Sequence, residues 1–239
     1  FLPGFFLAIF FALLSGAAVA KSSKGKELPL VERPIPAEDQ QLEARQIEEN
    51  TRAHGILVRE RKFYQDAALE EYLQEVAQPF IQALGMPHGR KFIFKILRAP
   101  TLNAMALSPG FIYFHSGIFA RIVNEAQLAF VLCHEISHVF HRDTLYQGIE
   151  EDAKARKSTV SDVLWNDPSP LFDYGVLTDY YLEHWYLISM KGFGQRFESR
   201  ADIFAVEQMV KLGYDPAQAV AFIDLMIAEI IFYQIFWLE

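Results

Sequence analysis

Two histidines and a glutamate stand close together in the middle of the chain, as His134, Glu135 and His138. In an α-helix, side chains four residues apart lie one above the other on the same face, so both imidazoles can reach one metal ion. Glu135 sits beside the first histidine, where it can reach a water at the metal and take its proton. The pattern therefore predicts two metal ligands and a general base, as used in metal-assisted hydrolysis.

The surrounding residues predict the helix that this motif needs. Residues 126–140 contain neither Gly nor Pro, and Asn124, with Gln127 three residues later, can cap the first free backbone N–H groups. The alternative is a pair of histidines that are simply packed or solvated on an amphipathic helix. The mostly apolar flanks favour the metal, because two His and one Glu are costly to bury without a metal or other partners.

A third metal ligand is available about sixty residues further along. A second helix is expected from about residue 195 to residue 212, ended by Gly213. Glu198 and Asp202 are four residues apart on this helix, so their carboxylates share one face. One carboxylate can bind the metal, while the other accepts the N–H of a ligating histidine and fixes its tautomer. Without the histidine motif, these carboxylates would be interpreted as a solvated charged face.

These motifs, His134-Glu135-x-x-His138 and Glu198-x-x-Ala201-Asp202, resemble those of the gluzincin metallopeptidases of the CAAX prenyl endopeptidase and HtpX family. Within that family, the soluble periplasmic branch is the most similar. Three earlier elements, at residues 103–107, 110–114 and 117–118, are similar to the family's Asn-Ala-Phe-Ala, Pro-Gly-Gly and Gly-Leu-Leu segment. The similarity runs from about residue 67 to residue 221, with the motifs in the family's order.

The resemblance implies a zinc-dependent endopeptidase with one Zn²⁺ per chain. It assigns three metal ligands, His134, His138 and Glu198. It makes Glu135 the general base, and it makes Asp202 the carboxylate that orients a ligating histidine. An oxyanion donor is also needed, and four residues are candidates: His184, Tyr186, Arg196 and Arg200.

Two β-strands are expected ahead of the histidine helix, at residues 91–97 and 111–115, because both stretches are rich in β-forming residues. Together with the helices they predict an α+β fold, mostly helical with a small sheet. In gluzincins an edge strand of such a sheet pairs with the extended substrate. The resemblance gives this task to a segment that includes Asn103, Ala104, Met105 and Ala106, whose main chain would hold a peptide of any sequence.

Three nearby residues need separate interpretation. His141 lies on nearly the same helix face as His134, so geometry allows it as a ligand, although Glu198 has the family match. His115 is expected to be structural or solvent-facing. The family often has Arg-His where this chain has Arg142-Asp143, so no task is assigned to Asp143.

The composition limits the partners. The chain of 239 residues is long enough for one domain with a substantial core, expected over residues 37–239. Its net charge of −8 argues against nucleic acid as a partner. The single cysteine, Cys133, excludes an intrachain disulfide and is expected to be a small core residue, because it points about 100° around the helix from His134.

The N-terminal residues predict export. Residues 5–14 are almost entirely apolar and lead into small residues ending in Ala-x-Ala, which is typical of a signal peptide, residues 1–20, cleaved after Ala20. An uncleaved membrane anchor is the alternative, although the run is short for a span. Residues 21–36 are expected to form a flexible leader. Together with the resemblance, export predicts a periplasmic protein acting on misfolded or misassembled envelope proteins, membrane proteins included.

Several flanking segments carry weaker expectations. Residues 37–60 predict a peripheral helix with solvated charges, and Asp66 begins a more amphipathic helix. The aromatic-rich residues 172–186 would either pack in the core or form a lid. The last helix, from Pro216, becomes strongly apolar over residues 227–237, which predicts either a core helix or a partner-facing surface. No His-Pro segment follows, so either a C-terminal part of the domain is missing or regulation differs from the family.

A second function is compatible with the sequence, namely a zinc-bound, chaperone-like or client-binding protein with little or latent proteolysis. The departures from the family pattern at Met105, Ser108 and Pro109 motivate it. The intact Glu135 argues against it, because a purely structural zinc site has no need of a base.

Overall fold

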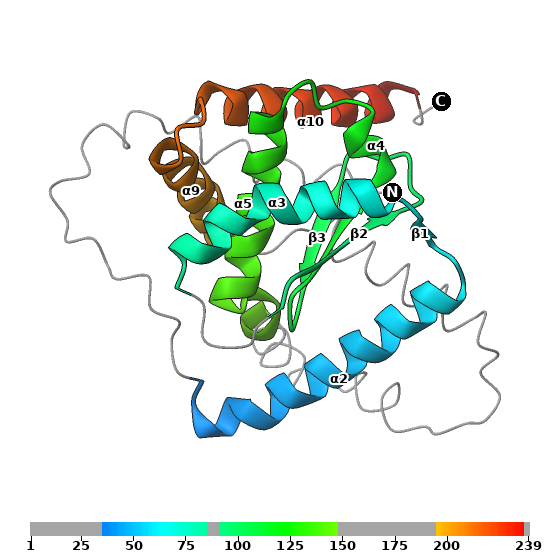
Figure 1. Ribbon diagram of the computed structural model, residues 1–239, viewed down its shortest axis with the longest axis vertical. Coiled ribbons are helices and arrows are strands. Elements are labelled where there is room, and N and C mark those ends of the chain that lie inside the picture. Colours follow the sequence, from blue (N-terminus) through cyan, green and yellow to red (C-terminus); the bar gives the residue numbers. More distant parts are fainter. Residues whose placement is uncertain (1–34, 86–90, 148–194, 237–239) are drawn as a thin grey trace, which may run out of the picture.

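The computed structural model describes residues 35–85, 91–147 and 195–236 (Figure 1). The expected signal peptide, nearly all of the expected leader and the aromatic-rich stretch lie outside the described residues, as do His184 and Tyr186. The described part combines helices with a four-stranded sheet of mixed strand direction. This arrangement confirms the predicted α+β fold.

The sheet has the strand order β1-β2-β4-β3. Strands β2 and β4 run parallel, whereas β1 and β3 each pair antiparallel with their neighbour. The bounds are β1 (Phe63–Tyr64), β2 (Ile93–Leu97), β3 (Ala104–Leu107) and β4 (Phe111–His115). The two predicted strands are confirmed as β2 and β4. The proposed substrate-binding segment contains β3, which forms one edge of this sheet.

Helices α3 (Ala67–Ala83) and α5 (Glu125–His141) pack against one face of the sheet (Figure 1). Helix α3 begins where it was predicted, because the Asp66 side chain accepts a hydrogen bond from the Leu69 N–H at 3.0 Å. The main core between these helices and the sheet includes the buried side chains Leu73, Phe80, Ile112, Phe114, Leu132 and Ile136. Burial of such side chains is the main force that holds α5 in place.

Helix α2 (Ala37–Arg59) covers the opposite face of the sheet. It buries more side chains against the sheet than the sequence suggested. Ala53 and Leu57 are buried in a second core with strand residues such as Met105 and Tyr113. The expectation that its charges are all solvated is wrong, because Glu43 is largely buried against Arg142. Polar residues share the buried stripe of α2 with apolar ones, which is why its apolar spacing looked loose.

Further polar contacts tie α2 to the sheet. The buried Asn50 amide donates to the Ser108 carbonyl oxygen at 2.9 Å. His54 Nδ1 lies 2.7 Å from the Tyr113 hydroxyl, and its ring stacks on Phe111. Burial lowers the pKa of His54, and the nearby Lys95 charge adds to that shift, so the neutral imidazole is favoured.

The remaining helices follow the sheet and the histidine helix. Helix α4 (Ser116–Phe119) follows β4, α9 (Gln195–Lys211) packs along α5, and α10 (Ala217–Phe236) crosses the N-terminal end of α5 (Figure 1). Phe222 of α10 packs against Phe130 of α5, whereas Val220 and Ile231 are about half exposed. The apolar last helix is thus a core helix on one side only. In the described ranges, no helix has the length and apolar character to cross a membrane.

Candidate metal centre

Helix α5 begins and ends in ways that fix the histidines. The Asn124 side chain accepts a hydrogen bond from the Gln127 N–H at 3.0 Å, which confirms the predicted cap. The helix ends at Arg142, which has a left-handed backbone conformation with φ 56° and turns the chain back. With one face of α5 buried in the main core, His134 and His138 lie on the side that faces α9.

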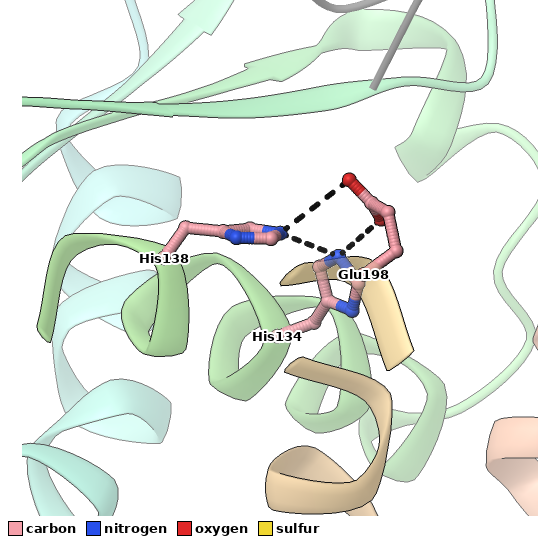
Figure 2. Close-up of side chains that lie close together, drawn as sticks. All are labelled: His134, His138 and Glu198. Carbon is pink, nitrogen blue, oxygen red and sulfur yellow. Dashed lines mark hydrogen bonds and ion pairs between the residues drawn. The ribbon is translucent and has the colours of Figure 1, made fainter. Parts of the chain in front are cut away.

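Three potential metal ligands converge between α5 and α9. The two Nε2 atoms of His134 and His138 are 3.0 Å apart. The Glu198 carboxylate oxygens lie 3.3 Å from His134 Nε2 and 3.9 Å from His138 Nε2. All three ligand atoms lie within 4.8 Å of one another, and Figure 2 shows the three side chains pointing toward one point.

Each histidine is oriented by its own carboxylate through the other ring nitrogen. His134 Nδ1 lies 2.9 Å from Asp202 Oδ1, and His138 Nδ1 lies 2.8 Å from Asp143 Oδ2. An ionised carboxylate can only accept, so both Nδ1 atoms carry the proton. Both Nε2 atoms therefore present lone pairs to the same point.

This donor set fits a divalent metal ion. Two imidazole lone pairs and a carboxylate would repel one another at these distances without a cation between them. Two His and one Glu are a common ligand set of catalytic zinc, and carboxylates behind the imidazoles are typical of such sites.

The pKa shifts of His134 and His138 also indicate a site for a cation. Burial, followed by the His134 charge, lowers the pKa of His138. Burial also acts to lower the pKa of His134, but hydrogen bonds to Asp202 and Glu198 outweigh it and raise that pKa. Without a metal, the raised pKa of His134 favours a proton on its Nε2 beside Glu198, and a bound cation would take the place of that proton, leaving both Nε2 lone pairs to the metal.

Glu135 is 7% exposed and lies next to His134 in the helix. Burial raises its pKa to about 7, the charge of Glu198 adds to the rise, and His134 opposes it. A carboxyl with a pKa near neutrality can both accept and return a proton at neutral pH. These properties suit the general base predicted from the sequence.

Helix α9 supplies the carboxylates from one face. Glu198 and Asp202 both point toward α5, as their spacing predicted, and both are largely buried. Ala201 and Ala205 of α9 are fully buried, and Ala205 belongs to the core cluster that also contains α5 residues. These small side chains let α9 approach α5 closely enough for a carboxylate to reach the histidines.

Asp143 is the site residue that the sequence interpretation missed. It is fully buried and accepts from His138 on one side and from the Arg200 guanidinium on the other. Burial raises the pKa of Asp143, although Arg200 opposes the shift. A carboxylate directly behind the end of the histidine helix was the only local signal for this role. The Arg200 guanidinium, one of the candidate oxyanion donors, therefore binds the carboxylate that orients His138.

The other candidate residues make contacts of a different kind. His141 Nδ1 faces the Ser137 carbonyl oxygen at 2.9 Å, and its ring packs edge-on against Phe140 and Phe204. His115 is buried and bonded to Thr101, which confirms a structural role; burial lowers its pKa to about 4. Cys133 is a fully buried core residue, as predicted. The guanidinium of Arg196, another candidate oxyanion donor, lies over the Phe197 ring. Gly213 follows α9 with a positive φ, which confirms the predicted end of that helix.

The proposed substrate-binding segment lies beside α5. Asn103 precedes β3, and its carbonyl oxygen accepts from the His115 N–H at 2.9 Å. Ala104 and Ala106 pack on the α5 side, whereas Met105 is buried on the α2 side. The segment therefore presents small side chains toward the metal-site helix.

The described architecture is that of a gluzincin metallopeptidase: two histidines on one helix, a carboxylate from a second helix, and a sheet whose edge strand lies beside them. The profile of peptidase family M48 matches residues 67–236, and the chain belongs to this family.

Several curated relatives that match are named as beta-barrel assembly-enhancing proteases. The chain is 32% identical over 96 residues to the putative protein of Vibrio cholerae, covering 40% of this chain and 19% of that protein. It is 28% identical over 161 residues to the Escherichia coli K12 protein, covering 63% and 32%. For the Yersinia pestis protein the identity is 31% over 130 residues, covering 52% and 26%. The matched stretch thus spans less than a third of each of these relatives.

Proposed function

We propose that the chain is a zinc-dependent endopeptidase, in which His134, His138 and Glu198 hold one Zn²⁺ and Glu135 is the general base. The observation that carries this proposal is the convergence of three acceptor groups on one point, with both Nδ1 protons already bound by carboxylates. The family profile supports peptide-bond hydrolysis as the reaction. Zinc is the metal that best suits two imidazoles and one carboxylate in a hydrolytic site.

The chain's own residues have separate tasks in this mechanism. When bound, the metal would supply Lewis-acid activation of a water and of the scissile carbonyl. Glu135 takes a proton from the attacking water and returns it to the leaving amine, and its burial, which favours the protonated form, helps it to hold that proton between the two steps. Asp202 and Asp143 hold the Nδ1 protons, so that both Nε2 atoms remain available as ligands.

The substrate is expected to bind as an added strand at β3. In an antiparallel pair, alternate residues direct their N–H and C=O groups to the partner strand. The His115 N–H donates to the Asn103 carbonyl oxygen, so the main-chain groups of Asn103 and Met105 face β4. The main-chain groups of Ala104 and Ala106 then point away from β4, where an extended peptide can pair with those of Ala104 and with the Ala106 N–H. The Ala106 carbonyl oxygen also faces the Thr144 hydroxyl at 3.5 Å, a weak contact that a peptide would have to replace or share.

The proposed substrates are misfolded or misassembled envelope proteins, and the proposed location is the periplasm. The relatives are named for enhancing β-barrel assembly, which supports envelope clients, and the signal-peptide pattern of residues 1–20 supports export to the periplasm. Protein or peptide substrates follow from the family, whereas envelope clients and membrane-protein clients are the finer proposal. Nucleic acid is not expected as a partner, since the net charge is −8.

The test compares the full chain with its Glu135→Gln variant for bound zinc and for cleavage of an unfolded model protein. We expect one zinc per chain in both proteins and cleavage by the wild type only, with a loss on the order of a thousandfold or more in the variant. Full cleavage by a zinc-loaded Glu135→Gln protein would refute the role of Glu135. Zinc binding without cleavage in either protein would favour the client-binding function.

A further inference from the structure

The three residues directly after α5, residues 142–144, connect three parts of the molecule: Arg142 is a turn residue, and Asp143 and Thr144 begin a further helical segment. This three-residue stretch is called the turn below. Its first residue, Arg142, has a left-handed backbone conformation with φ 56° and ψ 40°, where glycine is the residue with the lowest cost. What arginine adds at this position is a side chain that reaches another element. Its guanidinium Nε lies 2.9 Å from Glu43 Oε1 of α2.

Helix α2 holds this turn at two points. Besides the bond between Glu43 and Arg142, the Gln46 amide donates to the Thr144 carbonyl oxygen at 3.2 Å. Glu43 and Gln46 are three residues apart, so both project from one face of α2. The Glu43 and Arg142 side chains are only 17% and 13% exposed, and solvent therefore screens this pair less than a surface ion pair.

The residue between the two held positions supports the metal-site histidine. Asp143 accepts from His138 Nδ1 at 2.8 Å and from Arg200. Thr144 also donates weakly to Ala106 of β3, at 3.5 Å. A shift of the turn would therefore displace Asp143 from His138. The helix that holds the turn ends at Arg59, before residue 67, where the match to the peptidase family begins.

We propose that α2 is a positioning element of the metal centre: Glu43 and Gln46 fix Arg142 and Thr144, so that the Asp143 carboxylate between them orients His138. This inference rests on the proposed metal site at His134, His138 and Glu198. Its consequence is that a side chain outside the peptidase match sets the affinity for the metal without touching it.

The experiment measures the dissociation constant of the full chain for Zn²⁺, by competition with a chelator. Asp143→Ala is expected to weaken binding about 10–100-fold, as for other groups that orient ligating histidines. Glu43→Ala should weaken it by a smaller factor, on the order of fivefold. Glu48→Ala is the matched control, because it removes the same charge from the same helix at a position where the side chain is exposed and paired with Arg52.

A double variant separates positioning from general stabilisation. If Glu43 acts through Asp143, the Glu43→Ala change should cause no further loss of zinc affinity in the Asp143→Ala background. Independent, multiplying losses would overturn the proposal. Wild-type affinity in Glu43→Ala would also overturn it.

Arg142→Gly gives a second test that does not depend on a strained backbone. Glycine adopts the left-handed conformation at low cost, so thermal unfolding in the presence of chelator should change little while zinc affinity falls as in Glu43→Ala. Undiminished zinc affinity in this variant would contradict the role of the turn. The metal site itself is tested separately by His138→Ala: unchanged zinc binding there would refute the proposed function, whatever the α2 variants show.

Discussion

Helix α5 is held by neutral hydrogen-bond donors at its N-terminal end and by a buried charged network at its C-terminal end. At the first end, the hydroxyls of Tyr72 and Tyr214 donate to the exposed Glu125 carboxylate at 2.8 and 2.9 Å. At the second end, Asp143 binds His138 and Arg200, and Arg142 binds Glu43.

The difference between the two ends follows from what each must hold. The N-terminal end needs only an acceptor for free backbone N–H groups and a favourable charge, which Asn124 and Glu125 supply locally. The C-terminal end must hold an imidazole ring in a fixed orientation, which requires a buried carboxylate and partners for its charge. Changes at the C-terminal end should therefore alter metal binding, and changes at the N-terminal end should alter stability alone.

The largest effect is expected from Glu198→Ala, which removes the proposed third ligand beside the C-terminal half of α5. Its zinc affinity should fall by more than the roughly 10–100-fold that the loss of an orienting group costs. Chelator competition measures this, with Glu207→Ala as the control on an exposed position of the same helix. If Glu198→Ala bound zinc like the wild type, the third ligand would have to be sought elsewhere.

A second prediction separates the two orienting carboxylates. Asp202→Ala should weaken zinc binding about 10–100-fold, because it frees the ring of His134. Asp202 is held by α9 and not by the turn after α5, so the losses from Asp202→Ala and Glu43→Ala should multiply in the double variant. Zinc titrations of the single and double variants check this; a double variant no weaker than Asp202→Ala alone would mean that Glu43 acts through Asp202 and His134 instead of Asp143.

At the N-terminal end, Asn124→Ala should lower the free energy of unfolding by about 1 kcal/mol, because the cap of α5 is lost. Zinc affinity should stay at the wild-type value, since the cap lies more than two helical turns from His134. Chemical denaturation in the presence of chelator gives the first quantity and a zinc titration gives the second. A clear loss of zinc affinity would show that the two ends of α5 are not independent.

The smallest effect concerns the two tyrosines at that end. Burial and the hydrogen bonds to Glu125 raise the pKa of Tyr72 and of Tyr214 to about 12. A raised pKa means that their contribution to stability is complete below the unfolded-state pKa of about 10 and is lost as the pH rises through about 12.

The corresponding test compares the wild type with a Tyr72→Phe and Tyr214→Phe double variant. The variant should be less stable at pH 8 by about 1–2 kcal/mol, from two lost hydrogen bonds. The difference between the two unfolding free energies should shrink above about pH 10. A difference that stays constant to pH 12 would rule out these two hydroxyls as its source.

The parts of the site that depend on helical spacing could be predicted from the sequence. His134 and His138, and likewise Glu198 and Asp202, share helix faces because they are four residues apart. The start of α5 at Asn124 was also readable, since a helix cap is a local feature.

The parts that depend on long-range packing could not be predicted. Asp143 reaches His138 only because Arg142 reverses the chain in a left-handed conformation, which local residue preferences do not indicate for arginine. The strands β1 and β3 have two and four residues, too few to show an alternating pattern. The buried face of α2 mixes polar and apolar residues, so its contribution became visible only with its partners in place.

The most direct test of the central claim is the X-ray absorption spectrum at the zinc edge of the zinc-loaded chain and of its His138→Ala variant. The account predicts one zinc per chain with nitrogen and oxygen ligands at about 2.0–2.2 Å, two imidazoles in the wild type and one in the variant. A sulfur ligand at about 2.3 Å, or an unchanged number of imidazoles in His138→Ala, would contradict it.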